Sequence, residues 1–231
     1  MNNILEMLGD ENSQSAEVMQ QDPFLPQSDD TLDLSRQYNQ IMFFYEAGIR
    51  QLTAKLEILN REFEQCNDRN PIEDIKSRVK TPESIREKMK RRGLPLTISS
   101  MVNNIYDIAG IRVICPFITD VYQIARMLLS QTDVELIRMK DYIKNPKENG
   151  YRSLHLIVKI EVFFSDSMRK VPVEIQLRTI AMNFWASTEH QLRYKKNKEM
   201  TPEINKRLKD CADLMADADY QMQKLAEEIH F

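Results

Sequence analysis

The chain has 231 residues, of which 42% are hydrophobic and 29% are charged, so it contains enough apolar material for a buried core. This composition excludes an intrinsically disordered protein, and no apolar run approaches the roughly 20 residues of a membrane span. The N-terminus lacks the basic and apolar stretches of a signal peptide, so we expect a cytoplasmic protein. The three cysteines are widely spaced and form no CxxC pair, which argues against a structural zinc site.

The net charge of −3 is unevenly distributed along the chain. Residues 1–35 contain eight acidic residues and no lysine or arginine, so the remainder carries a net charge of +5. We expect this acidic leader to be flexible. Elsewhere the basic residues form two clusters, between Lys76 and Arg92 and between Arg138 and Arg152. Local cationic patches indicate small polyanionic ligands rather than a broad nucleic-acid surface.

The first predicted element is a helix over 36–66, in which apolar residues recur at a 4-3-4-3 spacing for about four heptads. The residues of this stripe are Tyr38, Met42, Tyr45, Ile49, Leu52, Leu56, Leu59 and Phe63. Such a stripe either packs on its own domain or also contributes to a subunit interface, and the pattern leaves both open. The next helix begins at Thr81-Pro82, an N-cap followed by a first-turn proline, and ends at Gly93.

Alternation and turn residues predict the strands of a sheet. The predicted strands lie near 108–117, 134–139, 153–164 and 171–178. A helix over 120–131, between the first two strands, indicates an α/β crossover. Thr179 can then cap a helix that extends to about Lys195.

Thr201-Pro202 repeats the start signal for a last helix. Its apolar stripe consists of Ile204, Leu208, Cys211, Met215, Met222, Leu225 and Ile229. Together the elements predict an α/β fold of the α+β kind, with a mixed sheet packed by helices and flanked by N- and C-terminal helices. We divide the chain into a leader, an N-terminal helix, a central core and a C-terminal helix, at residues 1–35, 36–69, 70–195 and 196–231.

The strand from Val171 to Thr179 alternates apolar and polar side chains, which face opposite sides of a strand. Its polar side carries Glu174, Gln176 and Arg178. Alone, this pattern is as typical of a solvated sheet edge as of a pocket. A second strand, predicted to start near residue 151, presents Tyr151, Ser153 and His155 in the same way. Two strands that offer an aromatic ring, an imidazole and a carboxylate on one side indicate the floor of a polar pocket.

The helix that begins at Pro82 carries a possible phosphate clamp. Ser84, Lys88 and Arg91 are spaced i, i+4, i+7 and share one face. Arg78 and Lys80 are expected in the preceding loop, near the positive end of the helix dipole. These groups could hold a triphosphate. A solvated basic helix face is the commoner reason for such a run, and the sequence leaves both open.

Asp107 stands at the mouth of the strand near 108–117. Mg²⁺ takes one or two carboxylates plus substrate phosphates, so Asp107 is a candidate metal ligand. Asp107 and Arg112 have opposite parity on an ideal strand. Either the strand begins after Asp107 or Gly110 marks an irregularity.

The segment between Lys140 and Tyr151 has turn chemistry at both ends, in Asn145-Pro146 and Asn149-Gly150. It supplies several lysines and then an aromatic ring suited to stacking on a base. No Walker A sequence, GxGxxG run or kinase signature occurs in the chain.

These motifs, in this order, resemble the synthetase domain of RelA/SpoT-type alarmone synthetases. The matching runs are Arg78-x-Lys80-x-x-x-Ser84-Ile-x-x-Lys88, Tyr106-Asp-Ile-Ala-Gly-Ile-Arg112, Gly150-Tyr-Arg-Ser-Leu-His155 and Glu174-Ile-Gln-Leu-Arg-Thr179. The resemblance covers residues 70–195, and the short length is similar to a stand-alone small alarmone synthetase of the RelP-type branch. It implies a nucleotidyltransferase-like fold and a stringent-response enzyme that moves pyrophosphate from ATP to the 3′-hydroxyl of GTP or GDP and releases AMP.

The resemblance also implies roles for individual residues. Arg78 and Arg112 should sandwich the adenine. The ATP phosphates should contact Lys80, Ser84, Lys88 and Arg91. Asp107 should bind Mg²⁺, with Glu174 as the general base and a second metal contact. On the guanine-nucleotide side, Tyr151 should stack on the base, with Lys140, Lys147, Asn149 and His155 around the ribose and phosphates. Gln176, Arg178 and Asn183 are motif positions with a less defined role, and we group Gln176 and Asn183 with the guanine nucleotide.

A homotetramer is a further implication of the resemblance, and the two helical stripes are consistent with it. No histidine is followed by aspartate, so the hydrolase activity of long family members is not expected, and neither is a membrane or nucleic-acid partner. Two alternatives stay open: a toxin-like relative that pyrophosphorylates adenine nucleotides or the 3′ end of tRNA, and a catalytically silent RNA-binding or regulatory module. The Gly150-Tyr151 pair argues against the first, and the presence of both Asp107 and Glu174 argues against the second.

Overall fold

The computed structural model describes residues 31–67, 69–194 and 200–229. Its elements in chain order are α2 (Thr31–Asn67), β1 (Asp74–Val79), α3 (Pro82–Arg91), α4 (Ile98–Asn104), β2 (Ala109–Cys115), α5 (Ile118–Leu129), β3 (Val134–Asp141), β4 (Leu154–Phe163), β5 (Met168–Thr179), α6 (Ile180–Tyr194) and α7 (Pro202–Glu228). The strands form one sheet in the order β1-β2-β5-β4-β3, in which only β2 and β5 pair in parallel. The predicted mixed sheet packed by helices is confirmed.

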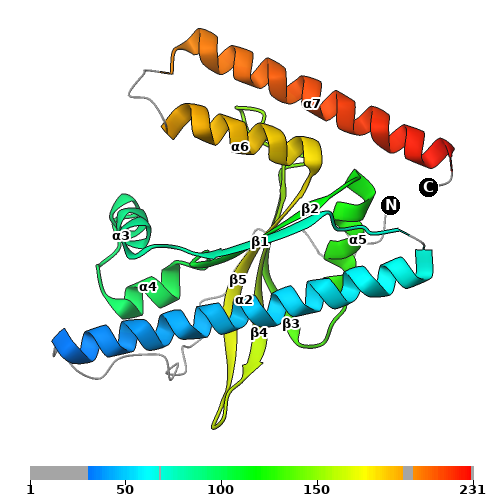
Figure 1. The fold of residues 1–231 in the computed structure, drawn as a ribbon. Helices are drawn as coiled ribbons and strands as arrows, with labels where there is room; N and C mark the ends of the chain where they lie inside the picture. The colour runs from blue at the N-terminus through cyan, green and yellow to red at the C-terminus, as the bar shows by residue number, and fades with distance from the viewer. Residues whose placement is uncertain (1–30, 68, 195–199, 230–231) are drawn as a thin grey trace, which may run out of the picture.

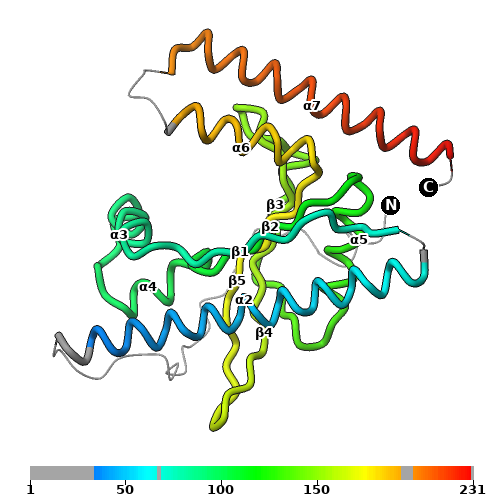
Figure 2. The backbone as a smooth tube through the Cα atoms, in the orientation of Figure 1, coloured from blue at the N-terminus to red at the C-terminus, as the bar shows by residue number. Residues whose placement is uncertain are grey.

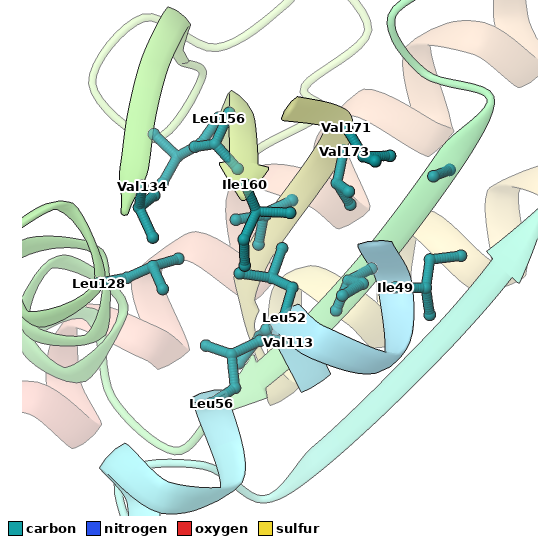
Figure 3. Packing of buried hydrophobic residues seen from close by; sticks show 14 of the residues in the cluster. Ile49, Leu52, Leu56, Val113, Leu128, Val134, Leu156, Ile160, Val171 and Val173 are labelled. Carbon is teal, nitrogen blue, oxygen red and sulfur yellow. The ribbon is translucent and has the colours of Figure 1, made fainter. Parts of the chain in front are cut away.

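The apolar face of the sheet is covered by α2, which crosses it as one long helix, and by α5 (Figure 1). Leu52 and Leu56 of α2 are completely buried, and Figure 3 shows them directed at sheet residues such as Val113 and Ile160. This packing of α2 on the sheet stabilises the fold, because each Å² of apolar area removed from water contributes about 25 cal/mol. The heptad stripe of α2 therefore packs on its own domain.

Three predicted helix starts are confirmed by their caps. The hydroxyl oxygens of Thr81 and Thr201 each accept a hydrogen bond, at 3.3 Å, from the backbone N–H three residues later, and proline follows both. Thr179 accepts from the N–H of Met182 at 3.1 Å at the start of α6. The helices α6 and α7 lie side by side at one end of the sheet, well separated from α2 (Figure 2).

Several boundaries differ from those predicted. The segment with Arg78, expected to be a loop, is the edge strand β1, and α4 was not predicted at all. The strand β4 begins at Leu154, so Tyr151 belongs to the preceding loop. The helix α2 begins at Thr31, inside the predicted leader, whose remaining residues lie outside the described part of the chain.

Only part of the predicted apolar stripe packs on this chain, at Met215, which lies against Trp185, Ala186 and Ala212, and α7 buries other residues instead. Its buried residues are Ala212, Asp219, Gln223 and Ala226. In contrast, more than 40% of the surface of Ile204, Met222, Leu225 and Ile229 is exposed. None of the described helices has the length and apolar content needed to cross a membrane.

Candidate active site

The strand register aligns two rows of side chains across the face of the sheet opposite α2. The first row, one residue from each strand in spatial order, is Lys76, Arg112, Gln176, His155 and Lys140. The second row is Arg78, Gly110, Glu174, Ile157 and Arg138. Residues paired across adjacent strands point to the same side, so this register brings residues from all five strands onto one polar face.

A cavity of about 220 Å³ opens on this polar face. Six residues assigned to the site from the sequence line it: Lys88, Asp107, Lys140, Lys147, His155 and Glu174. Six lining residues that the sequence analysis gave no role are Arg92, Asn104, Tyr106, Arg138, Tyr142 and Ile157. Three of these had a signal in the sequence: Arg92 and Arg138 belong to the basic clusters, and Tyr142 is an aromatic residue between Lys140 and Lys144. Nothing local pointed to Asn104 or Ile157, which reach the cavity through α4 and the sheet register.

The remaining predicted residues lie around the cavity or away from it. Ser84 and Arg91 are exposed on α3 and do not line the cavity, whereas the neighbouring Arg92 does and donates to the carbonyl oxygen of Asn104 at 3.0 Å. Asn149 accepts from the backbone N–H of Tyr151 at 3.2 Å and so closes a turn. Asn183 lies on α6, within 3.5 Å of the Ser187 hydroxyl, and does not line the cavity.

Asp107 lies between Lys80, which precedes α3, and Lys88, which belongs to α3. The ammonium group of Lys80 donates to Oδ2 of Asp107 at 2.8 Å, and Lys88 donates to the same oxygen. Burial acts to raise the pKa of Asp107, but the hydrogen bonds and charges of both lysines outweigh it and hold the pKa below its ordinary value. The strand begins at Ala109, which explains the opposite parity of Asp107 and Arg112. The other oxygen, Oδ1, is buried without a hydrogen-bond partner.

Glu174 is held in a closed ring of five hydrogen-bonded side chains, which we call the Glu174 ring. Oε1 of Glu174 lies 3.3 Å from Nδ1 of His155, and Nε2 of His155 lies 2.8 Å from the hydroxyl of Tyr151. Arg178 donates from Nη2 to that hydroxyl at 2.7 Å and to Oε1 of Gln176 at 2.9 Å. Gln176 closes the ring by donating to Oε2 of Glu174 at 3.0 Å.

The Glu174 ring has an electrostatic consequence for its carboxylate. Burial acts to raise the pKa of Glu174, but the hydrogen bond and charge of His155 and the hydrogen bond from Gln176 lower it, and the net pKa lies below its ordinary value. The nearby Asp107 opposes this effect by charge repulsion, which shows that the two carboxylates act on one another across the cavity. At neutral pH Glu174 is therefore ionised and able to accept a proton.

Two arginines on the polar face have buried guanidinium atoms without partners. The Nε atoms of Arg112 and Arg178 are both buried and make no hydrogen bond. The pKa of Arg112 is lowered, first by burial and then by the charges of Arg178 and Arg78. Neighbouring guanidinium groups of this kind are suited to bind an anionic or aromatic ligand.

Aromatic side chains gather at the mouth of the β3–β4 loop, residues 142–153. The rings of Tyr142, Tyr151 and His155 make edge contacts with centroid distances of 5.3–6.0 Å. The ammonium group of Lys147 lies 4.8 Å from the centroids of both tyrosine rings. Such an arrangement of rings and a cation is suited to a purine nucleotide, since rings stack on bases and cations attract phosphates.

Comparison with known proteins agrees with this geometry. Residues 77–199, slightly more than half of the chain, match the family described as the region found in RelA / SpoT proteins. The chain is 39% identical to GTP pyrophosphokinase YwaC of Bacillus subtilis (strain 168), over 87% of this chain and 96% of the relative. It is 34% identical to GTP pyrophosphokinase YjbM of the same organism, over 84% of this chain and 90% of the relative.

Solved structures lead to the same family. Small alarmone synthetase 1 from Bacillus subtilis, bound to its product pppGpp, has a TM-score of 0.77 at 34% identity, over 85% of this chain and all of the other. Small alarmone synthetase 2 from the same organism has a TM-score of 0.74 at 40% identity, over 83% and 98%. The chain therefore belongs to the RelA/SpoT family. Within this family, its fold is that of the small alarmone synthetases.

Proposed function

We infer that this protein is a (p)ppGpp synthetase, which transfers pyrophosphate from ATP to the 3′-hydroxyl of GTP or GDP and releases AMP. The observation that carries the assignment to this site is the pair of carboxylates, Asp107 and Glu174, that face one cavity lined by cations. The two relatives from Bacillus subtilis, which match most of this chain, are GTP pyrophosphokinases. These findings argue against a catalytically silent module.

The ATP side of the site consists of β1, α3 and β2. We assign the adenine to the guanidinium planes of Arg78 and Arg112, which extend from neighbouring strands on the same face. We assign the phosphates to Lys80 and Lys88, and we add Arg92, since it lines the cavity. We keep Ser84 and Arg91 in the proposed phosphate site as the resemblance implies, although both are exposed on α3 and neither lines the cavity.

Asp107 and Glu174 are suited to hold Mg²⁺. The buried oxygen Oδ1 of Asp107 has no hydrogen-bond partner, so a ligand atom is available where the two lysines do not reach. Two carboxylates leave the other coordination positions to substrate phosphates and water, which is the usual arrangement for this ion. When bound, the ion supplies positive charge that neutralises the oxygens of the transferring group.

The acceptor side consists of the β3–β4 loop and the Glu174 ring. We place the guanine against Tyr151, and its phosphates near Lys140, Lys147 and Arg138. Glu174 takes the proton of the 3′-hydroxyl while the hydroxyl oxygen bonds to the β-phosphorus of ATP. The bond between that phosphorus and the α,β-bridging oxygen breaks, and AMP leaves. His155 and Gln176 orient the two carboxylate oxygens for this step.

We further propose that the protein is a homotetramer located in the cytoplasm, where its nucleotide substrates are abundant. The exposed apolar residues of α7, among them Met222, Leu225 and Ile229, support an assembled state, because monomers seldom expose large apolar patches. Sedimentation of the purified protein across a concentration series would measure its oligomeric state.

One assay tests the reaction and its alternatives together. The protein is incubated with ATP labelled at the β-phosphate and, in parallel, with GTP, GDP, GMP, ADP or tRNA, and the products are resolved. We expect label on GTP or GDP together with release of AMP. Label on ADP or tRNA alone would identify a toxin-like relative, and no transfer to any acceptor would contradict the proposed function.

A further inference from the structure

The β3–β4 loop lies against α7 at Gly150. Gly150 has φ of +87°, a conformation that favours glycine. A Cβ added there would lie 2.5 Å from the Cβ of Ala212, a buried residue of α7. The loop backbone and the helix are therefore in contact at a point where the loop has no room for a residue larger than glycine.

Arg152 reinforces this contact with hydrogen bonds on both sides of it. Its Nη1 atom donates to the carbonyl oxygens of Gly150 and Ala212, both at 3.2 Å. Its Nη2 atom donates to Oδ1 of Asp213, also at 3.2 Å. One guanidinium group therefore joins the end of the loop to two consecutive residues of α7. Its planar fork is suited to this task, because it presents several donors in a fixed geometry.

Tyr151 lies between Gly150 and Arg152 in the sequence, and it packs on both α6 and α7. Its ring packs against the small cluster formed by Trp185 and Ala186 of α6 and Ala212 of α7. The indole N–H of Trp185 donates to the carbonyl oxygen of Leu208 at 2.8 Å, which fixes α6 to α7. The ring of Tyr151 is thus supported from α6 and α7, while its hydroxyl takes part in the Glu174 ring.

We propose that α7 positions the guanine nucleotide, with Arg152 as the positioning residue that acts through Tyr151. Arg152 is not among the residues that line the cavity, so its effect on the nucleotide is indirect. The inference rests on the proposed function, since it assigns Tyr151 to the guanine base. It also makes α7, whose outer face is apolar and exposed, part of the acceptor site.

The test is nucleotide binding by the full chain, measured by calorimetry for GDP and for a non-hydrolysable ATP analogue. In Arg152→Gln we expect the Kd for GDP to rise roughly tenfold, the range for hydrogen bonds to a charged group, and the Kd for the ATP analogue to stay within about twofold. Arg152→Lys, which restores the charge, should recover part of the loss. Asp213→Asn, which leaves both carbonyl contacts intact, should show a smaller shift of the same kind.

The controls separate positioning from a general structural role. Asp217→Asn, an exposed substitution on α7, should bind both nucleotides like the wild type. Hydrogen exchange should accelerate at loop amides near residues 147–152 in Arg152→Gln and not in the sheet. Equal loss of GDP and ATP-analogue binding, or unchanged GDP binding, in folded Arg152→Gln would overturn the proposal. A wild-type protein that binds no guanine nucleotide would instead overturn the proposed function.

Discussion

Lys80 and Asp107 form a charged hydrogen bond, with 2.8 Å between Nζ and Oδ2. This bond joins the residue that follows β1 to the turn that precedes β2. Lys88 binds the same oxygen from α3, so the carboxylate is fixed on one side only. Its second oxygen, Oδ1, is buried and has no hydrogen-bond partner. The two lysines thus favour the ionised form of Asp107, which is the form that the proposed role as a metal ligand requires.

Asp107→Asn should therefore lose activity in a way that excess Mg²⁺ does not restore. Loss of the carboxylate leaves two lysines without a counter-charge and removes a metal ligand, so we expect kcat to fall on the order of 100-fold. A magnesium titration of the initial rate measures this. Asp166→Asn, an exposed change in the β4–β5 turn, is the matched control and should keep the wild-type rate. Recovery of the Asp107 variant at high magnesium would refute the assignment as a required ligand.

Two substitutions at Tyr151 separate its ring from its hydroxyl. Tyr151→Ala should raise the KM for the guanine nucleotide roughly tenfold with little change in the KM for ATP, because a stacking surface is lost. Tyr151→Phe keeps the surface but opens the Glu174 ring between His155 and Arg178, so we expect kcat to fall several-fold with a small change in KM. Steady-state kinetics with each substrate varied in turn gives both constants. Equal effects of the alanine variant on both KM values would argue against stacking.

Breaking the buried ion pair between Arg69 and Asp120 should lower the stability of the fold without changing catalysis. Arg69 donates to both carboxylate oxygens, at 3.0 and 2.7 Å, and Asp120 is completely buried. Asp120→Ala breaks this buried pair and should lower the free energy of unfolding by about 3–5 kcal/mol. Urea unfolding measures this, and Glu135→Ala, from an exposed pair with Lys170, should show little change. Similar losses in both variants would contradict the buried pair's role.

Asp219 of α7 predicts how stability depends on pH. Burial raises its pKa above the ordinary value, although the hydrogen bond from Thr179 opposes this. A raised pKa favours the protonated form in the folded state, so the stability it contributes is present at low pH and is lost as pH rises through that pKa. Thermal unfolding measured from pH 4 to pH 7 should show the melting temperature of the wild type falling relative to that of Asp219→Asn as pH rises. A melting temperature of the wild type that rises relative to the variant would contradict the raised pKa of Asp219.

Local patterns predicted much of the fold because their physical causes are local. The alternation of Val171, Val173, Ile175 and Leu177 placed one side of β5 in the core, where each is now completely or almost completely buried. The threonine–proline pairs placed the starts of α3 and α7, since a cap satisfies backbone N–H groups within one turn. The polar face of β5 was predicted for the same reason.

Register and edge pairing could not be predicted in this way. The strand β1 carries exposed Lys76, Ser77 and Arg78, so its sequence resembles a loop, and its extended form depends on pairing with β2. The Glu174 ring likewise requires β4 and β5 to align His155 with Gln176, which no local pattern fixes. On α3, helical periodicity favoured Arg91, whereas the residue that lines the cavity is Arg92, the C-cap of this helix.

Glu174→Gln tests the central claim, that Glu174 removes the proton of the acceptor hydroxyl. An amide retains the shape and one of the two acceptor oxygens that contact His155 and Gln176, but it cannot take the proton. We expect binding of the ATP analogue within about twofold of wild type and a loss of product formation on the order of 100- to 10,000-fold. Glu57→Gln, an exposed change on α2, is the control and should keep full activity. Full turnover to (p)ppGpp by the Glu174 variant would contradict the account.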